Sequence, residues 1–152
     1  MDVHFGRPSL PAGSNMRHRG THLMISAFCC GLSVSLGALG AHLLGEQLDD
    51  KALHAFATAN RYLFLHSLAG FALALASKDI WLLKLTPIVA VLWLIGSALF
   101  CGSLYLYAMT GTTSLMFLTP MGGLSYLLAW GLAMWLGFQV LQTDSESTSK
   151  GA

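Results

Sequence analysis

The stretch TANRYLFLHSLA, residues 58–69, decides how this chain folds because it puts polar side chains where an apolar segment begins. The apolar run that continues from it, Tyr62 to Ala76, is 15 residues long. At about 1.5 Å per residue this run covers roughly 23 Å, less than the ~30 Å hydrocarbon core of a bilayer. A helix that crosses a membrane here must therefore start near Ala57 and end near Ser77.

A helix that starts near Ala57 places three polar residues inside the membrane. Asn60 and Arg61 enter its outer edge, and His66 lies about 13 Å below the start of the helix. Ionisable groups inside a bilayer are costly and usually have a partner. We therefore expect the rest of the chain to be a scaffold that tolerates them.

The composition is that of a membrane protein. Of the 152 residues, 55% are hydrophobic and only 10% are charged, whereas soluble domains carry about 25% charged residues. No Asp, Glu, Lys or Arg occurs between Leu85 and Leu141. We predict one compact membrane domain with short tails. The net charge of +1 gives no basis for a nucleic-acid partner.

The cysteines do not suggest a disulfide framework or a zinc site. Cys29, Cys30 and Cys101 all lie in apolar stretches, their number is odd, and none is in a CxxC motif. They are interpreted as small buried residues.

The apolar segments predict an all-α protein, a bundle of four transmembrane helices at residues 22–44, 57–77, 88–109 and 120–141. Residues 1–21 are predicted to be a flexible tail, and 143–152 a disordered one. Residues 46–59 form either an interfacial amphipathic helix or the start of one long helix that continues into the second span. The Thr-Pro pairs at 86–87 and 119–120 predict a threonine N-cap followed by proline in the first turn.

Two features leave the N-terminal region open. Met16 with the basic residues after it would make a good translation start. The segment 22–44 also has signal-peptide features, because basic residues precede it and Ala38-Leu39-Gly40 resembles a cleavage site. Its apolar region of about 20 residues exceeds a usual signal core, which favours a retained span.

Small residues recur at helical spacing in each predicted span, which lets helix backbones approach closely in lipid. In the first span they are Ser26, Cys30, Ser33, Gly37 and Gly40, with a mean spacing of 3.5 residues. In the second they are Asn60, Ser67, Gly70, Ala74 and Ser77; in the third, Ser97 and Cys101; in the fourth, Ala129, Ala133 and Gly137.

The distribution of basic residues predicts the orientation. With four spans, both termini and the middle turn share one side of the membrane. That side carries Arg7, Arg17, Arg19, Lys78, Lys84 and Lys150. The other side carries only Lys51 and Arg61. Because basic residues concentrate on the cytoplasmic side, both termini are predicted to be cytoplasmic.

Arg61 and His66 are the sharpest candidates for a function. Arg61 could bind an anionic headgroup, substrate or partner; alternatively it snorkels to the surface or pairs with Glu46, Asp49 or Asp50. His66 could carry protons or ligate haem; alternatively it is a neutral imidazole hydrogen-bonded within the bundle. Bis-histidine haem ligation with His42 is disfavoured because the two depths differ by about 10 Å.

Other polar residues are expected near the same outer face. Tyr105 and Tyr107 fit an aromatic belt. The opening of the fourth span, with Gly122 and Gly123, could receive an anion at a helix N-terminus or could simply allow capping and close packing. The candidate polar cluster comprises His42, Glu46, Asn60, Arg61, Tyr62, His66, Ser103, Tyr105, Thr119, Gly122 and Gly123. No reaction motif is found, and no cofactor or metal is predicted.

Four short motifs in order resemble a known family. They are Gly37-Ala38-Leu39-Gly40-Ala41-His42, Asn60-Arg61-Tyr62 followed by His66, Gly102-Ser103-Leu104-Tyr105, and Thr119-Pro120-Met121-Gly122-Gly123. Over residues 32–141 the chain resembles uncharacterised protein family 0382, also called domain of unknown function 423, whose eukaryotic relatives are similar to transmembrane protein 256. The resemblance implies a four-span bacterial inner-membrane protein and assigns no activity to any residue.

The leading hypothesis is a non-enzymatic, partner-binding or self-associating helix bundle. Its partners would be the lipid bilayer and a second copy or another membrane protein. The alternative is a small-solute or proton transporter that works as an oligomer, with Arg61 and His66 on its path.

Overall fold

The computed structural model describes residues 14–76 and 85–150, and within these ranges the chain is helical and contains no strand. Helix α1 spans Ser14–Leu39 and continues into the π-helical turn η1, Gly40–Leu44. Helix α2 spans Asp50–Leu75. Helix α4, Thr86–Gly96, the π-helical turn η2, Ser97–Cys101, and α5, Gly102–Thr110, form one continuous rod. Helix α6 spans Leu118–Lys150.

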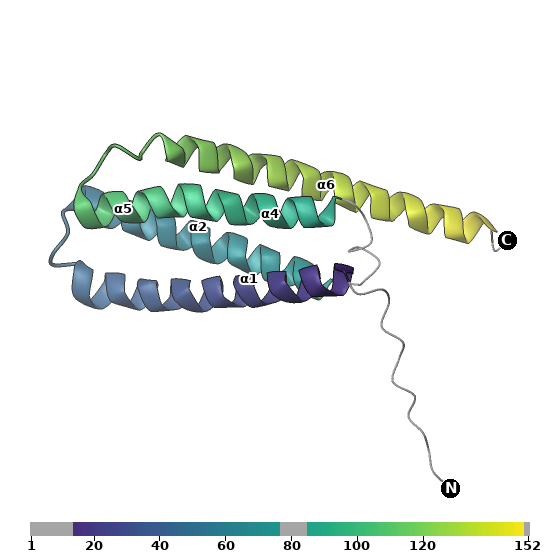
Figure 1. Cartoon of the computed structure of the whole chain (residues 1–152), viewed down its shortest axis with the longest axis horizontal. Helices are drawn as coiled ribbons and strands as arrows, with labels where there is room; N and C mark the ends of the chain where they lie inside the picture. The colour runs from purple at the N-terminus through teal and green to yellow at the C-terminus, as the bar shows by residue number, and fades with distance from the viewer. Residues whose placement is uncertain (1–13, 77–84, 151–152) are drawn as a thin grey trace, which may run out of the picture.

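The rods lie side by side, with both ends of the described chain at the same end of the molecule (Figure 1). Helix α1 packs along α2, and α4 with η2 packs along α6. Helix α2 joins the two pairs by packing against η2 and α5. It is therefore the central element.

Three helices in the described ranges are long and apolar enough to cross a membrane. They are Arg17–Leu44, Thr86–Thr110 and Leu118–Gln139, with mean hydropathies of 1.9, 2.0 and 1.3. Helix α2 is not among them, because Asn60, Arg61 and His66 interrupt its apolar sequence. The residues that identified the second span as unusual are thus the ones that lower its hydropathy.

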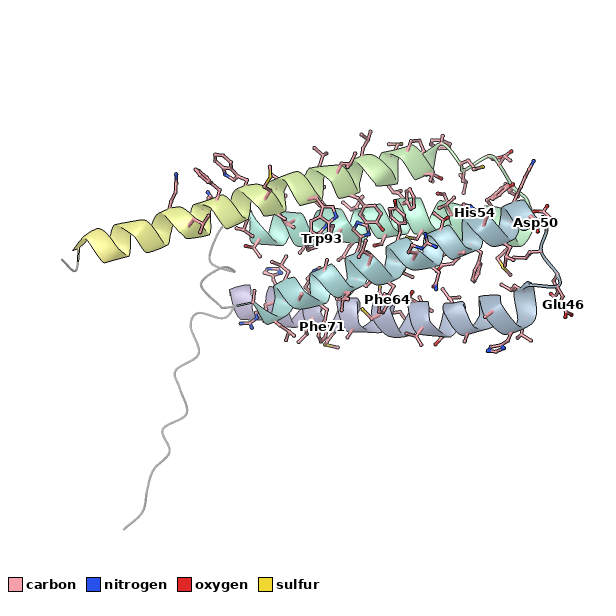
Figure 2. All side chains as sticks on the ribbon, turned by 180° about the vertical axis from the view of Figure 1, so that it is seen from behind. Glu46, Asp50, His54, Phe64, Phe71 and Trp93 are labelled. Atoms are coloured by element: carbon pink, nitrogen blue, oxygen red, sulfur yellow. The ribbon has the colours of Figure 1, made fainter. Side chains whose placement is uncertain are left out.

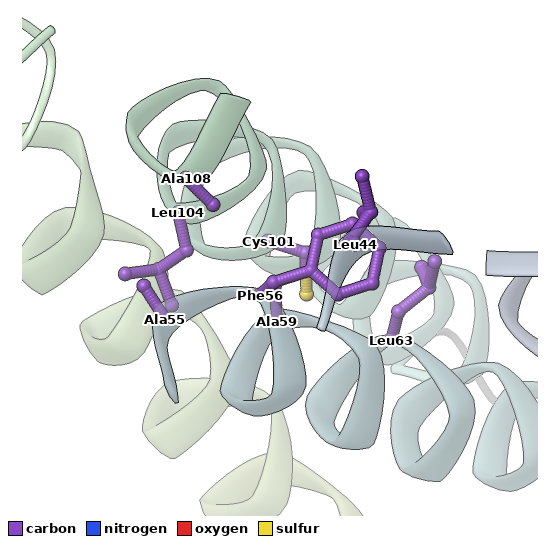
Figure 3. Close-up of a cluster of buried hydrophobic side chains, with 8 residues drawn as sticks. All are labelled: Leu44, Ala55, Phe56, Ala59, Leu63, Cys101, Leu104 and Ala108. Atoms are coloured by element: carbon purple, nitrogen blue, oxygen red, sulfur yellow. The ribbon is translucent and has the colours of Figure 1, made fainter. Parts of the chain in front are cut away.

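The main apolar core lies toward the end of the bundle that carries the α1–α2 connection (Figure 3). Phe56 and Leu63 of α2 contribute the larger side chains, and Leu44 and Leu104 pack on them from the neighbouring rods. A second cluster, around Val89 and Trp93 of α4 and Ala129 of α6, fills the space between those helices.

Small residues let α1 approach a neighbouring helix closely, as the sequence predicted, and the structure shows that this helix is α2. A Cβ atom on Gly40 would lie 2.8 Å from the Phe56 ring, and one on Gly37 would lie 2.9 Å from the Asn60 amide nitrogen. Gly70 lies equally close to Ser26. The bundle therefore uses the segment that a signal-peptide cleavage would remove. In α6 the prediction fails for Gly137, which is exposed with nothing within 4 Å of an added Cβ.

The N-terminal tail is shorter than predicted. Residues 14–21 belong to α1, whereas residues 1–13 lie outside the described ranges. The Arg19 Nε–H donates to the Ala74 carbonyl at 2.7 Å. The last carbonyls of a helix have no partner within it and attract cations. This bond to the end of α2 explains why the first turns of α1 are ordered.

Within residues 46–59 the second alternative holds from Asp50 onward, because α2 runs without a break from Asp50 into the predicted second span. Asp49 caps α2 by accepting a 2.8 Å hydrogen bond from the Ala52 N–H. At the other end of the chain, residues 143–150 were expected to be disordered, but α6 continues to Lys150. No Gly or Pro occurs there, so neither of the two strongest helix breakers interrupts α6. The predicted middle turn with Lys78 and Lys84 lies outside the described residues.

Neither threonine of the Thr-Pro pairs is an N-cap. The N-cap of α4 is Leu85, without a side-chain cap, and Thr86 is already helical and buried. Helix α6 starts at Leu118, before Thr119. The Thr119 hydroxyl instead contacts a neighbouring helix, because the bundle offers it a buried partner.

Candidate functional site: polar contacts between the helices

Asn60 connects three helices through one side chain. Its Oδ1 accepts hydrogen bonds from the Tyr105 hydroxyl of α5 at 3.0 Å and from the Ser33 hydroxyl of α1 at 2.9 Å. Tyr105 also packs edge-on against Phe56, with ring centroids 5.0 Å apart. Tyr105 therefore faces the bundle interior, and its expected place in an outer aromatic belt is wrong.

A second polar contact joins α5 to α6. The hydroxyls of Ser103 and Thr119 lie 2.7 Å apart, and Ser103 also donates to the Phe100 carbonyl at 3.0 Å. Beside this pair, a Cβ on Gly122 would overlap the Phe100 backbone nitrogen. Gly122 thus permits backbone contact between helices, which favours the packing interpretation over an anion site.

His66 is held on both ring nitrogens. Its Nδ1–H donates to the Tyr62 carbonyl at 2.8 Å, and its Nε2 accepts from the Trp130 indole N–H at 3.2 Å. This pattern is that of a neutral imidazole protonated at Nδ1. The ring is 3% exposed and stacks on Tyr126, with centroids 3.5 Å apart. A haem-ligand role would require the Trp130 bond to break.

Tyr126 extends this network to the π-helical turn η2. Its hydroxyl donates to Ser97 at 3.0 Å and lies 3.4 Å from the Cys101 sulfur. Gly96 makes room for the phenol ring, because a Cβ there would lie 2.6 Å from it. Single π-helical turns within α-helices often occur at functional sites. Here the turn places two polar side chains around one buried tyrosine.

Four predicted site residues, His42, Glu46, Arg61 and Gly123, take no part in these contacts. An added Cβ on Gly123 would lie 3.9 Å from the Phe100 ring. His42, in η1, is exposed, and so is Glu46, which lies at the end where α1 and α2 connect (Figure 2). Arg61 is also exposed and makes no hydrogen bond or ion pair with any residue in the described ranges. Of the alternatives for Arg61, pairing with an acidic residue is therefore not observed there.

Arg61 borders a shallow open groove of about 290 Å³ between α1 and α2. The remaining lining residues are Ser33, Val34, Gly37, Asn60 and Phe64.

The sequence did not single out Tyr126 and Trp130, although both contact His66. They are four residues apart, and Tyr126 is in turn four residues after Gly122, so the three share one face of α6. That spacing was the available signal. In the described ranges no three His, Cys, Asp or Glu residues come together as a metal site would require.

Comparison with known proteins places the chain in a family. The model of "Protein of unknown function (DUF423)" matches residues 36–123. A UPF0382 membrane protein of Haemophilus influenzae is 37% identical over 111 residues, which cover 72% of this chain and 85% of the relative. The UPF0382 membrane protein YwdK of Bacillus subtilis is 35% identical over 111 residues, which cover 71% of this chain and 88% of the relative.

The UPF0382 inner membrane protein YgdD of Escherichia coli K12 is 33% identical over 115 residues, which cover 74% of this chain and 85% of the relative. No solved structure matches. These matches confirm the family that the sequence motifs indicated. The chain is a membrane protein that belongs to the DUF423 family, whose curated relatives carry the name UPF0382.

Proposed function

We propose that the chain is a four-pass inner-membrane protein, with both termini in the cytoplasm, which acts without catalysis by self-association. The fourth pass is α2, which lies alongside the three apolar rods over most of their length (Figure 1). The excess of basic residues on the side of the termini supports the orientation. The relatives named as inner membrane proteins support the location.

The observation that carries self-association is an unused face of α1. Ala27, Gly31, Ser35 and Ala38 form an exposed stripe of small residues at helical spacing, opposite the residues that contact α2. An added Cβ on Gly31 would meet nothing within 4 Å. Small residues spaced in this way allow two transmembrane helices to approach closely. A second copy of α1 fits this stripe.

The contacts of His66 favour this proposal over the transporter alternative. A proton carrier needs a ring nitrogen that can exchange protons, whereas both nitrogens of His66 are engaged inside the bundle. His66→Leu in reconstituted vesicles separates the two hypotheses. A substrate or proton flux that this substitution abolishes would support transport.

The test of self-association is the mass of the protein in mild detergent. We expect an oligomer for the unmodified chain and a monomer for Gly31→Leu, because leucine would hold the helices apart. Gly131→Leu is the matched control, since Gly131 is also exposed with nothing within 4 Å of an added Cβ, but lies on α6. A monomeric unmodified protein, or equal effects of both substitutions, would contradict the proposal.

A further inference from the structure

Arg61 is a cation for which the described chain provides no anion. It is adjacent to Asn60, which lies level with Gly37 of α1, about 10 Å along that helix from Leu44. The acidic residues nearest to it along α2 are Asp49 and Asp50, at least eleven residues earlier, or about 16 Å. A guanidinium at such a depth normally has a partner. The described residues do not supply one.

The groove beside Arg61 has the shape and chemistry for an amphiphilic molecule. Val34, which is 65% exposed, and Phe64, which is 42% exposed, supply apolar walls. Gly37 also lines the groove, and its lack of a side chain leaves room beside the Asn60 amide nitrogen. The groove opens outward between α1 and α2 instead of being enclosed, so a molecule dissolved in the bilayer reaches it directly.

Asn60 adds polar donors to the same groove. Its Oδ1 is held by Tyr105 and Ser33, which turns the amide nitrogen toward Gly37, where the two nearly touch. The Nδ2 hydrogens bond to no residue in the described ranges. A guanidinium and an amide thus present N–H donors side by side.

We propose that this groove binds an anionic phospholipid, with its phosphate on Arg61 and Asn60 and an acyl chain along Val34 and Phe64. Arginine forms bidentate, charge-assisted hydrogen bonds with phosphate. A zwitterionic lipid offers the same phosphate, but its ammonium group would find no carboxylate near the groove among the described residues. Charge complementarity therefore selects a lipid with net negative charge.

The test measures lipids retained by the full chain. The protein is equilibrated in micelles containing equal amounts of phosphatidylglycerol and phosphatidylethanolamine, and bound lipids are counted by native mass spectrometry. We expect preferential retention of phosphatidylglycerol. Arg61→Gln should lower that retention roughly tenfold, the value of a lost charge-assisted bond. Lys51→Gln is the matched control, because it removes an exposed positive charge from the same helix outside the groove.

A second pair of variants tests the acyl-chain site without changing charge. Val34→Trp should fill the groove and also lower retention of phosphatidylglycerol, whereas Leu127→Trp adds the same ring to an exposed position on α6. Equal retention of both lipids, or unchanged retention in Arg61→Gln, would overturn the proposal. So would competition by inorganic phosphate, which would indicate a free anion. If Arg61→Gln instead dissociated an oligomer while the bound lipid was retained, the partner of Arg61 would be a carboxylate on another protein molecule, which would also overturn the proposal.

Discussion

At the scale of single residues, the polar groups of α2 are tolerated because most of them face other helices. Asn60 bonds to α1 and to α5, and His66 bonds to α6. Interhelical hydrogen bonds in membranes contribute only about 0.6 kcal/mol on average, because the unfolded chain finds partners too. Their main effect is therefore to select one rotation of α2 among its neighbours.

The bond between Tyr105 and Asn60 gives the first prediction. Tyr105→Phe should lower the free energy of unfolding by about 0.5–1.5 kcal/mol, since it removes one hydroxyl donor and keeps the ring. Unfolding in mixed micelles of mild detergent and dodecyl sulfate, followed by tryptophan fluorescence, measures this. Tyr107→Phe is the control, because the Tyr107 hydroxyl bonds to no described residue. Equal losses for the two variants would contradict the assigned contact.

The hydrogen bond from Trp130 to His66 gives the second prediction. Trp130→Phe should destabilise the fold by about 1–3 kcal/mol, because it leaves a buried imidazole nitrogen without its donor. Trp135→Phe should change stability much less, since Trp135 is exposed and packs only on Phe138 among the aromatic residues described. The same unfolding assay compares them. A Trp130→Phe variant as stable as Trp135→Phe would show that this bond does not hold His66.

At the scale of elements, the distances between helices depend on a few glycines. Gly122 brings the start of α6 against the backbone of η2, and Gly96 receives the Tyr126 ring. Both contacts surround the π-helical turn. Because helices in lipid gain no hydrophobic energy by associating, such close backbone packing contributes much of what holds them together.

A third prediction compares two glycines of α6. Gly122→Ala should lower the free energy of unfolding by about 1–3 kcal/mol, because the new methyl group would overlap the Phe100 backbone. Gly131→Ala should be neutral or stabilise by up to about 1 kcal/mol, since alanine favours a helix and finds open space there. If both variants behaved alike, α6 would not contact η2 as described. The unfolding midpoint in detergent again provides the measurement.

At the scale of the whole molecule, α2 lies at the centre of the bundle, between α1 on one side and the other helices on the other side. Helices α1 and α6 form its two flanks (Figure 1). Each exposes large apolar side chains, such as Phe28 on α1 and Leu127 on α6. Exposed apolar surface of this kind is expected against lipid rather than water. Polar residues of the α1–α2 connection gather at one end (Figure 2).

The fourth prediction concerns topology. A fluorescent protein fused to either terminus should fluoresce, and alkaline phosphatase fused there should be inactive, because both termini are proposed to be cytoplasmic. A cysteine introduced at Gln47, in a variant without the three native cysteines, should react with an impermeant thiol reagent added outside the cell. Termini on opposite sides of the membrane would contradict the four-pass proposal, and labelling only after lysis would contradict its orientation.

The sequence by itself determined the helical class, the approximate extent of each rod and the face of α1 on which small residues gather, whereas the structure showed that this face meets α2. Apolar length and the spacing of Ser33, Gly37 and Gly40 are local properties, so they can be read without coordinates. The same locality explains the errors at the chain ends. Arg19 is ordered by a carbonyl of α2 that is distant in sequence.

Only the tertiary structure decided which polar residues meet. The sequence grouped eleven residues by their depth in the membrane alone. In the fold, Asn60 bonds to Tyr105 and His66 bonds to Trp130, whereas Arg61 is exposed and takes no part in these contacts. Depth along a helix follows from counting residues, but contact also depends on how each helix is rotated about its axis. That rotation is set jointly by all the packed neighbours, so no single segment contains it.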